Sequence, residues 1–283
     1  MFEDLIKKAE ESYMNLQFRD DFLFCKILEE NTDIAKELLE LILNIGIWKV
    51  IPQKQKTIEI TADGRGIRLD VYLNDDQGTI YDLEMQTTKK KDLPKRTRYY
   101  QGMIDLDLIN RGAKFEELKQ SYIIFICTED PFDEGRHIYS FENLCRENPD
   151  KSLGDEAYKV FLNASGTKMD VSDNMLDFLK LVNTGEGSTD LSKRIIKEVE
   201  KARSHEEWRM EYMTLFMRDE EKRAEGREEG REEGRVEGKR ELVSQLIEEG
   251  TLSVDKGADI LGITIKELET YLLQNEHKIP QKI

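Results

Sequence analysis

The chain has 283 residues, of which 36% are charged and 38% hydrophobic, and its formal net charge at pH 7 is −16. This length suits one large domain, or one domain with an appendage, because a single core rarely grows beyond about 250–300 residues. The negative charge excludes a general nucleic-acid coating protein, which needs an excess of Lys and Arg. We expect a folded domain with a highly charged extension.

The sequence indicates a cytoplasmic protein without a membrane helix. Its longest apolar stretch, residues 38–51, is interrupted by Glu40 and Lys49 and falls short of the roughly 20 residues that span a bilayer. The first residues are acidic and do not follow a secretory pattern. Three widely spaced cysteines form no zinc-type pair, which favours a reducing compartment.

Helical and extended patterns alternate along the first 187 residues. The first 45 residues are predicted to be helical, because apolar residues from Ile34 to Ile45 recur every three or four positions and Gly46 ends the pattern. A second helix is predicted over residues 95–110. Extended structure is predicted over residues 57–60, 67–73, 80–86, 122–127 and 159–162. We therefore expect residues 1–187 to form one mixed α/β domain.

The rest of the chain is predicted to be helical in two parts. Residues 188–240 form a long charged helix containing the segment GREEGREEGRVEG, whose glycines recur every four residues and lie on one slowly drifting stripe. Such a stripe lets two helices approach closely, although a solvated helix weakened by about 1 kcal/mol per glycine is the alternative. Residues 241–283 form a small helix-turn-helix-like unit, with a capping box at Thr264–Glu267. The sequence does not distinguish whether this unit binds DNA or another protein.

Residues 66–86 read as two alternating strands joined by a tight turn. If Asp76, Gln77 and Gly78 form the loop, with Gly78 left-handed, facing residues have numbers that sum to 154. The pairs of residues 73 and 81, 71 and 83, and 69 and 85 then form an apolar face. On the opposite face Tyr72 meets Asp82, residue 68 meets residue 86, and Asp70 meets Glu84.

If Asp70 lies opposite Glu84, the repulsion between their negative charges must be offset. Directly opposed side chains have Cβ atoms about 4.5–5.5 Å apart, and like charges at this distance repel each other. A raised pKa, a basic side chain such as Arg68, or a divalent cation would relieve this repulsion. A hairpin that simply exposes both acids to solvent is a further alternative.

The residue pattern resembles that of a known nuclease superfamily. Asp70, followed after the turn by Glu84-Met85-Gln86, is similar to the motif of the PD-(D/E)XK nucleases. Across residues 18–181 the chain resembles the Rpn family of recombination-promoting nucleases, also labelled putative transposases, through RGIRLDVY, YDLEMQT, LPKRTRYYQGMIDLDLINRG and SYIIFICTEDPF. The resemblance implies a restriction-endonuclease-like core with a mixed central sheet flanked by helices. It also implies a metal-dependent DNA endonuclease linked to recombination or mobile elements.

The resemblance assigns roles to particular residues. Asp70, Glu84 and Gln86 become the catalytic residues, and Asp70 and Glu84, assisted by Asp21, would hold Mg²⁺ or Mn²⁺. Gln86 occupies the position where the superfamily usually has Lys, so it supplies no positive charge there. A catalytically silent nuclease fold, acting as a DNA-binding or regulatory oligomer, is therefore the alternative.

A basic segment follows the motif and reads KKKDLPKRTR. Its cationic side chains suit the phosphates of double-stranded DNA, although an ordinary solvated basic loop is the alternative. The candidate DNA-binding residues are Lys89, Lys90, Lys95, Arg96 and Tyr100. We expect duplex DNA as the partner and a homo-oligomer formed through the C-terminal helix.

Overall fold

The computed structural model describes residues 2–53, 56–58, 66–109 and 111–275. It divides into two compact units, Met1–Met213 and Thr214–Ile283, and the division falls within a long helix. Glu59 and Ile60 of the predicted strand, and Asn110 of the predicted helix, lie outside the described residues.

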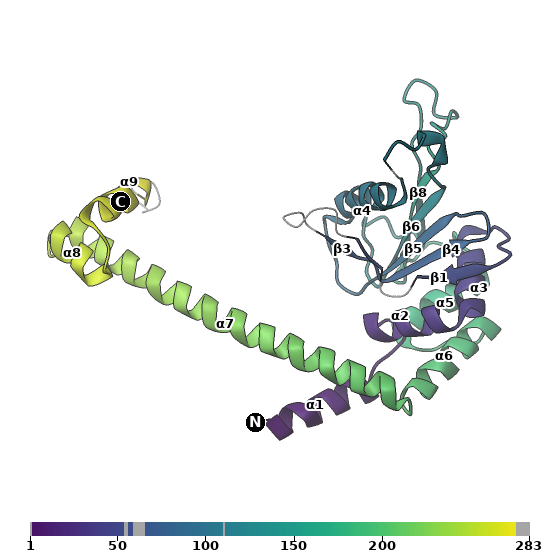
Figure 1. Ribbon diagram of the computed structural model, residues 1–283, viewed down its shortest axis with the longest axis horizontal. Helices are drawn as coiled ribbons and strands as arrows, with labels where there is room; N and C mark the ends of the chain where they lie inside the picture. The colour runs from purple at the N-terminus through teal and green to yellow at the C-terminus, as the bar shows by residue number, and fades with distance from the viewer. Residues whose placement is uncertain (1, 54–55, 59–65, 110, 276–283) are drawn as a thin grey trace. The chain divides into compact units, whose positions relative to one another are not determined.

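The first unit is built on a mixed sheet whose strand order is β1-β4-β5-β6-β8-β7 (Figure 1). Strands β5, β6 and β8 are parallel, and the other neighbours are antiparallel. Strands β2 and β3 pair separately. The strands are β1 (Val50–Pro52), β2 (Thr57–Ile58), β3 (Ile67–Arg68), β4 (Val71–Asp75), β5 (Ile80–Gln86), β6 (Ser121–Cys127), β7 (Ile138–Phe141) and β8 (Ala157–Asn163).

Helices cover both faces of this sheet (Figure 1), which confirms the predicted mixed α/β architecture. The helices are α1 (Phe2–Met14), α2 (Asp21–Glu30), α3 (Thr32–Leu43), α4 (Leu93–Leu108), α5 (Asp173–Thr184), α6 (Asp190–Ala202), α7 (Glu206–Glu248), α8 (Val254–Leu261) and α9 (Ile265–Asn275), with a short 3₁₀ turn at Phe115–Glu117. Because helices cover both faces, the central strand β6 is apolar along nearly its whole length.

Two hydrophobic clusters lie on opposite faces of the sheet. Helices α2, α3, α5 and α6 pack on one face, where Phe24, Leu38 and Phe178 meet Leu83 of β5. Helix α4 packs on the other face and contributes Tyr100, Met103 and Ile104. Full burial of one large apolar side chain stabilises the fold by roughly 1.5–3 kcal/mol. This packing holds helix α4 against one face of β5, the face on which the even-numbered residues of β5 lie.

The predicted register of the β4–β5 hairpin is confirmed. Val71 pairs with Leu83, Tyr72 with Asp82, and residue 73 with residue 81. Gly78 has φ +84°, the left-handed conformation that the loop requires. The hydrophobic pattern and the glycine therefore fix which residues of the two strands face one another.

The same register was wrong for the residues before Asp70. Leu69 belongs to the cluster under α4 and not to the apolar face that contains Leu83, and Arg68 pairs with Thr57 and not with Gln86. The chain bends at Asp70, and the Leu69 amide donates to the carbonyl of Lys56. Pairing with β2 thus replaces pairing with β5 at this point.

The single helix predicted over residues 188–240 is in fact two helices, α6 and α7. The turn after Ala202 is closed by backbone bonds from Ser204 and His205, and Nδ1 of His205 accepts the Trp208 amide at 3.3 Å. Trp208 is then buried in the same cluster as Phe178. Helices α5 and α6, on either side of the predicted boundary at residue 187, both contribute to this cluster.

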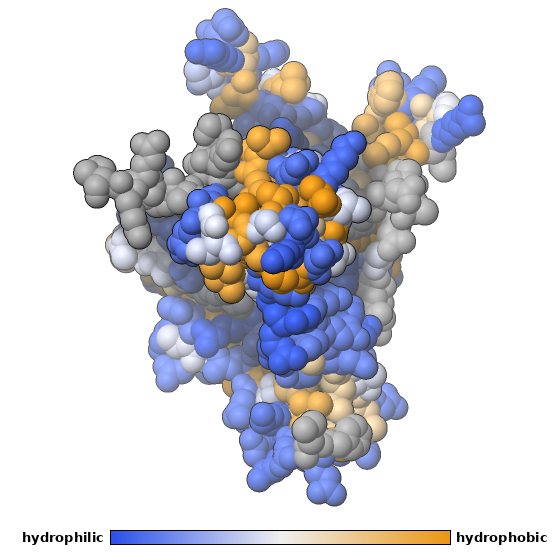
Figure 2. All heavy atoms as spheres, turned by 90° about the vertical axis from the view of Figure 1, so that its left-hand side faces the viewer, coloured by the Kyte–Doolittle hydropathy of each residue, from blue (hydrophilic) through white to orange (hydrophobic). Residues whose placement is uncertain are grey.

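The second unit contains the rest of α7 together with α8 and α9. Val243, Ala258 and Leu268 form its small core. The predicted capping box is present, because Thr264 and Glu267 exchange side-chain and backbone hydrogen bonds. Apolar side chains also gather on the outside of this unit (Figure 2). Within the described ranges, no helix has the length and apolar character needed to cross a bilayer.

The left-handed Gly78 gives a direct test of the hairpin. Gly78→Ala should lower the free energy of unfolding by about 1–2 kcal/mol, because a Cβ disfavours this backbone conformation, while the nearest atom to an added Cβ, 3.5 Å away, is at ordinary contact distance. Urea denaturation would measure the loss. Gly46→Ala is the control, since nothing lies within 4 Å of its added Cβ and its φ is not left-handed. Equal effects at both positions would contradict the proposed role of the turn.

Candidate functional site

The carboxylates of Asp70 and Glu84 each accept a backbone amide from the opposite arm of the hairpin. Oε1 of Glu84 accepts the backbone amide of Asp70 at 3.1 Å, and Oδ2 of Asp70 accepts the backbone amide of Met85, also at 3.1 Å. Each carboxylate therefore binds the main chain of the opposite arm of the hairpin. These bonds replace β4–β5 strand pairing at the bend, where the chain turns toward β2. They hold the two carboxylates close to each other between the arms of the hairpin.

A guanidinium from α4 completes this arrangement. Nη2 of Arg96 lies 3.2 Å from Oε2 of Glu84 and 2.8 Å from the Tyr100 hydroxyl, and Nη1 donates to Oε1 of Gln86 at 3.0 Å. The guanidinium also lies over the rings of Tyr100 and Phe125. Arg96 and Tyr100 are four residues apart and so project from the same face of α4.

The ion pair with Glu84 thus comes from Arg96, whereas the sequence had suggested Arg68. Arg68 lies on β3 and is exposed. Burial raises the pKa of both Asp70 and Asp21, and the charge of Arg68 only partly opposes this rise. The sequence had placed Arg96 among the DNA-binding residues, so the structure gives it a second set of contacts within the acidic site.

Gln86 is buried beside Arg96 and its side chain is held in place. Its amide nitrogen donates to the carbonyl of Thr88 at 2.7 Å, while its amide oxygen accepts from Arg96. Gln86 therefore fills the position where the superfamily usually has Lys, and its side-chain amide binds the guanidinium of Arg96.

Asp21 lies in the first turn of α2 and is open to solvent. The preceding Asp20 uses its carboxylate to accept the Gln17 amide at 2.6 Å, so the two neighbouring acids have different roles. The charge of Asp21 contributes to the raised pKa of Asp70. Helix α2 therefore brings a further acid into electrostatic contact with the hairpin.

Sequence reasoning missed Asp82 as a site residue. Its side chain is 0% exposed, and neither carboxylate oxygen has a hydrogen-bond partner among the described residues. The strand alternation that was used to pair Asp82 with Tyr72 also puts Asp82, Glu84 and Gln86 on one side of β5. This alternation could have identified Asp82 as a site residue from the sequence.

Burial raises the pKa of all three hairpin acids. Burial and then the charge of Asp21 raise the pKa of Asp70 to about 6, while the Met85 amide opposes this shift. The pKa of Glu84 is well above its ordinary value because of burial, then because of Asp82 and Asp70. The pKa of Asp82 is also well above its ordinary value, first because of burial and next because of Asp70.

The predicted DNA-binding residues fall into two groups. Arg96 and Tyr100 contact each other and the acidic site. Lys90 and Lys95 are exposed in the loop before α4 and in its first turn, and Lys89 is exposed and paired with Asp133. The three lysines thus lie on the surface near the site and not within it.

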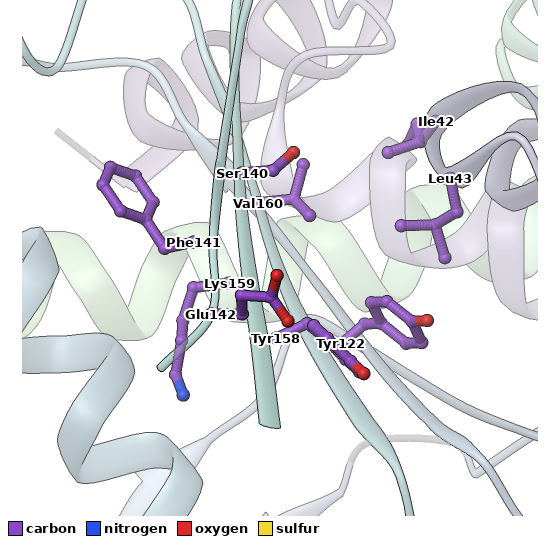
Figure 3. A pocket seen from close by; sticks show the side chains of 9 residues that line it. All are labelled: Ile42, Leu43, Tyr122, Ser140, Phe141, Glu142, Tyr158, Lys159 and Val160. Atoms are coloured by element: carbon purple, nitrogen blue, oxygen red, sulfur yellow. The ribbon is translucent and has the colours of Figure 1, made fainter. Parts of the chain in front are cut away.

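A surface pocket of about 250 Å³ lies elsewhere on the sheet (Figure 3). It is near the start of β6 and β8, where Tyr122 and Tyr158 stack, whereas Glu84 lies near the end of β5. Its lining residues are Ile42, Leu43, Tyr122, Ser140, Phe141, Glu142, Tyr158, Lys159 and Val160. The hairpin acids are not among them.

The chemistry of the hairpin acids suits a divalent cation. Carboxylate oxygens are the ligands that Mg²⁺ and Mn²⁺ prefer, and Asp82 has two buried oxygens that the described part of the protein leaves unpartnered. Among the described residues, no three acidic, His or Cys side chains already converge as a metal-ligand set. Asp70 and Glu84 instead bind backbone amides and Arg96.

A mixed sheet with an Asp and a Glu on one hairpin, followed by a third polar residue two positions on, defines a nuclease domain of the PD-(D/E)XK class. A family model described as PD-(D/E)XK nuclease family transposase matches residues 18–235, and the chain belongs to this family. The resemblance seen in the sequence is thereby confirmed. Membership gives the chain a nuclease-type function linked to mobile elements. Searches of curated proteins and of solved structures gave no significant match.

The raised pKa of Asp70 predicts how stability depends on pH without divalent cations. The folded state holds the Asp70 proton up to about pH 6, whereas the ordinary pKa is 3.8. The stabilisation of the folded state by protonated Asp70 is fully present below the ordinary pKa of 3.8. It is lost as the pH rises through about 6. The melting temperature in EDTA should therefore fall over this range, and Asp70→Asn should reduce the fall. An equal fall in the variant would contradict this assignment.

Proposed function

We propose that this protein is a metal-dependent endonuclease that hydrolyses phosphodiester bonds of double-stranded DNA. The reciprocal bonding of Asp70 and Glu84 carries this proposal, because it holds two acids together, at the position of the family motif, where they repel each other. A bound cation would remove that repulsion.

In this proposal Asp70 and Glu84 hold a divalent cation, and Asp21 assists from α2. The cation supplies a bound water of lowered pKa and stabilises negative charge that develops on the phosphate. Mg²⁺ or Mn²⁺ fits this set of oxygen ligands. The electrostatic effect of Asp21 on Asp70 supports its inclusion.

Arg96 supplies the positive charge that Gln86 lacks. Its guanidinium is held by Gln86, Glu84 and Tyr100, so it reaches the site in a fixed orientation. A planar guanidinium binds phosphate oxygens in a bidentate manner. We assign Arg96 to the phosphate that is cleaved, Gln86 and Tyr100 to positioning Arg96, and Lys89, Lys90 and Lys95 to neighbouring phosphates of the duplex.

Cleavage of supercoiled plasmid tests the proposed activity. The wild-type protein should nick the plasmid in Mg²⁺ or Mn²⁺ and not in EDTA. Asp70→Asn and Glu84→Gln should each reduce the rate at least 100-fold, because each removes a ligand charge while keeping the side-chain shape. Asp76→Asn, which changes an exposed acid in the same hairpin loop, should keep the wild-type rate.

The alternative is a catalytically silent nuclease fold that binds DNA. Gln86 at the lysine position favours this alternative, as does the net charge of −16. DNA binding by the wild-type protein without cleavage in either metal would support it and reject the endonuclease. Cleavage that persists unchanged in Asp70→Asn and Glu84→Gln would instead place the activity at another site.

We also propose that α7 joins copies of the chain into a homo-oligomer. Gly226, Gly230, Gly234 and Gly238 lie within this helix, and an added Cβ at any of them would meet no described atom within 4 Å. Four glycines weaken a helix by about 4 kcal/mol. Three solvent-screened Glu–Arg pairs at spacing i,i+3 offset only a small part of this loss. Packing against a second α7 would supply the remainder.

Sedimentation of the full chain tests this assembly. Replacing Gly230 and Gly234 together by Leu should raise the helix content, since Leu has the higher propensity, yet block the close approach and give the monomer mass of 33.1 kDa. Glu229→Ala, beside the stripe on the same helix, is the control and should leave the mass unchanged. A double variant that sediments like the wild type would contradict assembly through the stripe.

A further inference from the structure

Three tyrosines form a stack across the parallel strands of the sheet. Tyr81 of β5 pairs with Tyr122 of β6, and Tyr122 pairs with Tyr158 of β8, so the three side chains lie at one level on the same side of the sheet. The ring centroids of Tyr81 and Tyr122 are 5.6 Å apart, those of Tyr122 and Tyr158 are 4.9 Å apart, and the interplanar angles are 7° and 20°. The spacing of the rings thus follows the spacing of about 4.8 Å between neighbouring strands.

The stack ends at Tyr158, although the sheet continues with β7. Extending the register of β7 with β8 by one residue beyond Phe141 brings Glu142, and no aromatic ring, opposite Tyr158. The Phe141 ring packs on the other side of the sheet, 5.8 Å from the ring of Phe161. Within the described part of the chain, Tyr122 is the one ring that stacks on Tyr158. The face of Tyr158 that points toward β7 therefore has no ring against it.

The surface pocket of about 250 Å³ lies at this end of the stack (Figure 3). Tyr122 and Tyr158 form one part of its lining, Ser140 and Glu142 form another, and two apolar residues at the end of α3 lie across from them. The volume is below the roughly 300–1,000 Å³ of pockets for drug-sized ligands. A single flat ring system is therefore the size of ligand that suits the pocket.

The polar groups of the pocket select the chemistry of that ring. Oε2 of Glu142 accepts the Ser152 hydroxyl at 3.0 Å, and no described residue donates to Oε1 of Glu142. Lys159, the cationic residue of the lining, donates to the carbonyl of Ala157 at 2.9 Å. Because a carboxylate only accepts hydrogen bonds, Glu142 favours a ring with an N–H donor and disfavours one that turns carbonyl oxygens toward it.

We propose that this pocket binds a single unpaired nucleobase with an exocyclic amino group, which stacks on Tyr158 and donates to Glu142. Every base has a π-face that stacks on aromatic side chains, and this stacking is general in the binding of single-stranded nucleic acid. The amino group of cytosine donates to Glu or Asp, whereas thymine presents a carbonyl oxygen at the same position. DNA, the substrate of a nuclease family, supplies such bases where its strands separate. The pocket lies at the start of β8 and the hairpin acids near the end of β5, so the two sites are separate.

Equilibrium dialysis of the full chain against deoxycytidine and against deoxyuridine, in EDTA, tests this proposal. The two nucleosides differ in the amino group or carbonyl oxygen of the pyrimidine ring, and neither carries a phosphate that the lysines near the hairpin could bind. Deoxycytidine should bind about 5-fold more tightly or better, because of its hydrogen bond to a charged group. Glu142→Gln should remove this preference, since an amide also donates. Equal binding of both nucleosides by the wild type would overturn the proposal.

Variants at Tyr158 test the stacking. Tyr158→Leu keeps an apolar side chain but removes the ring, and it should weaken deoxycytidine binding about 10-fold or more, whereas Tyr158→Phe keeps the ring and the affinity. Trp48→Ala, at an exposed aromatic residue outside the pocket, is the control and should bind like the wild type. Glu142 is exposed, so Glu142→Gln tests the pocket even if Tyr158→Leu does not fold. Wild-type affinity in a folded Tyr158→Leu, or a wild-type protein that does not bind deoxycytidine, would contradict the assignment.

A single-stranded oligodeoxycytidine shows where the base comes from. If a DNA strand supplies it, the oligonucleotide should bind more tightly than deoxycytidine and should lose affinity in Tyr158→Leu. If Tyr158→Leu weakens the binding of deoxycytidine alone, the pocket takes a free nucleoside or nucleotide. Tighter binding of N-acetyltryptophanamide than of deoxycytidine would assign the pocket to an aromatic side chain of a protein and reject the nucleobase.

Discussion

The bonding between Asp70 and Glu84 is the constraint on which the site depends. Each carboxylate accepts a backbone amide from the other arm of the hairpin, so the acids are part of the hairpin's own hydrogen bonding. The left-handed Gly78 and the apolar pairs between β4 and β5 fix the register that makes these bonds possible. The fold thereby keeps together two groups that repel each other.

Helix α4 supplies a positive charge that contacts the acidic site. This helix is held on the sheet by Tyr100, Met103 and Ile104, and the same packing delivers Arg96 to Glu84 and Gln86. Burial, and then the charge of neighbouring carboxylates, raises the pKa of Asp70, Asp82 and Glu84, and the charge of Arg96 only partly opposes this rise. The proposed cation and the proposed role of Arg96 both follow from the excess of negative charge at the site.

The sequence predicted the parts of the fold that local patterns determine. The hairpin register, the Gly78 turn and the Thr264 capping box depend on neighbouring residues, and all three are confirmed. Helix α5 was missed, although Ser172 caps it and Gly185 ends it, because turn residues on both sides masked its short apolar pattern. The bend at Asp70 and the contacts of Arg96 depend on pairing with β2 and on the docking of α4, which no local pattern encodes. Asp82 was overlooked because an acid within an apolar strand was treated only as the partner of Tyr72.

A crystal structure of the protein with Mn²⁺, using anomalous scattering to locate the ion, would show whether Asp70 and Glu84 bind one cation. One anomalous peak is expected between the hairpin arms, about 2.1 Å from carboxylate oxygens of both Asp70 and Glu84. A peak at another place, or acids that keep only their amide and Arg96 contacts at saturating Mn²⁺, would contradict this expectation.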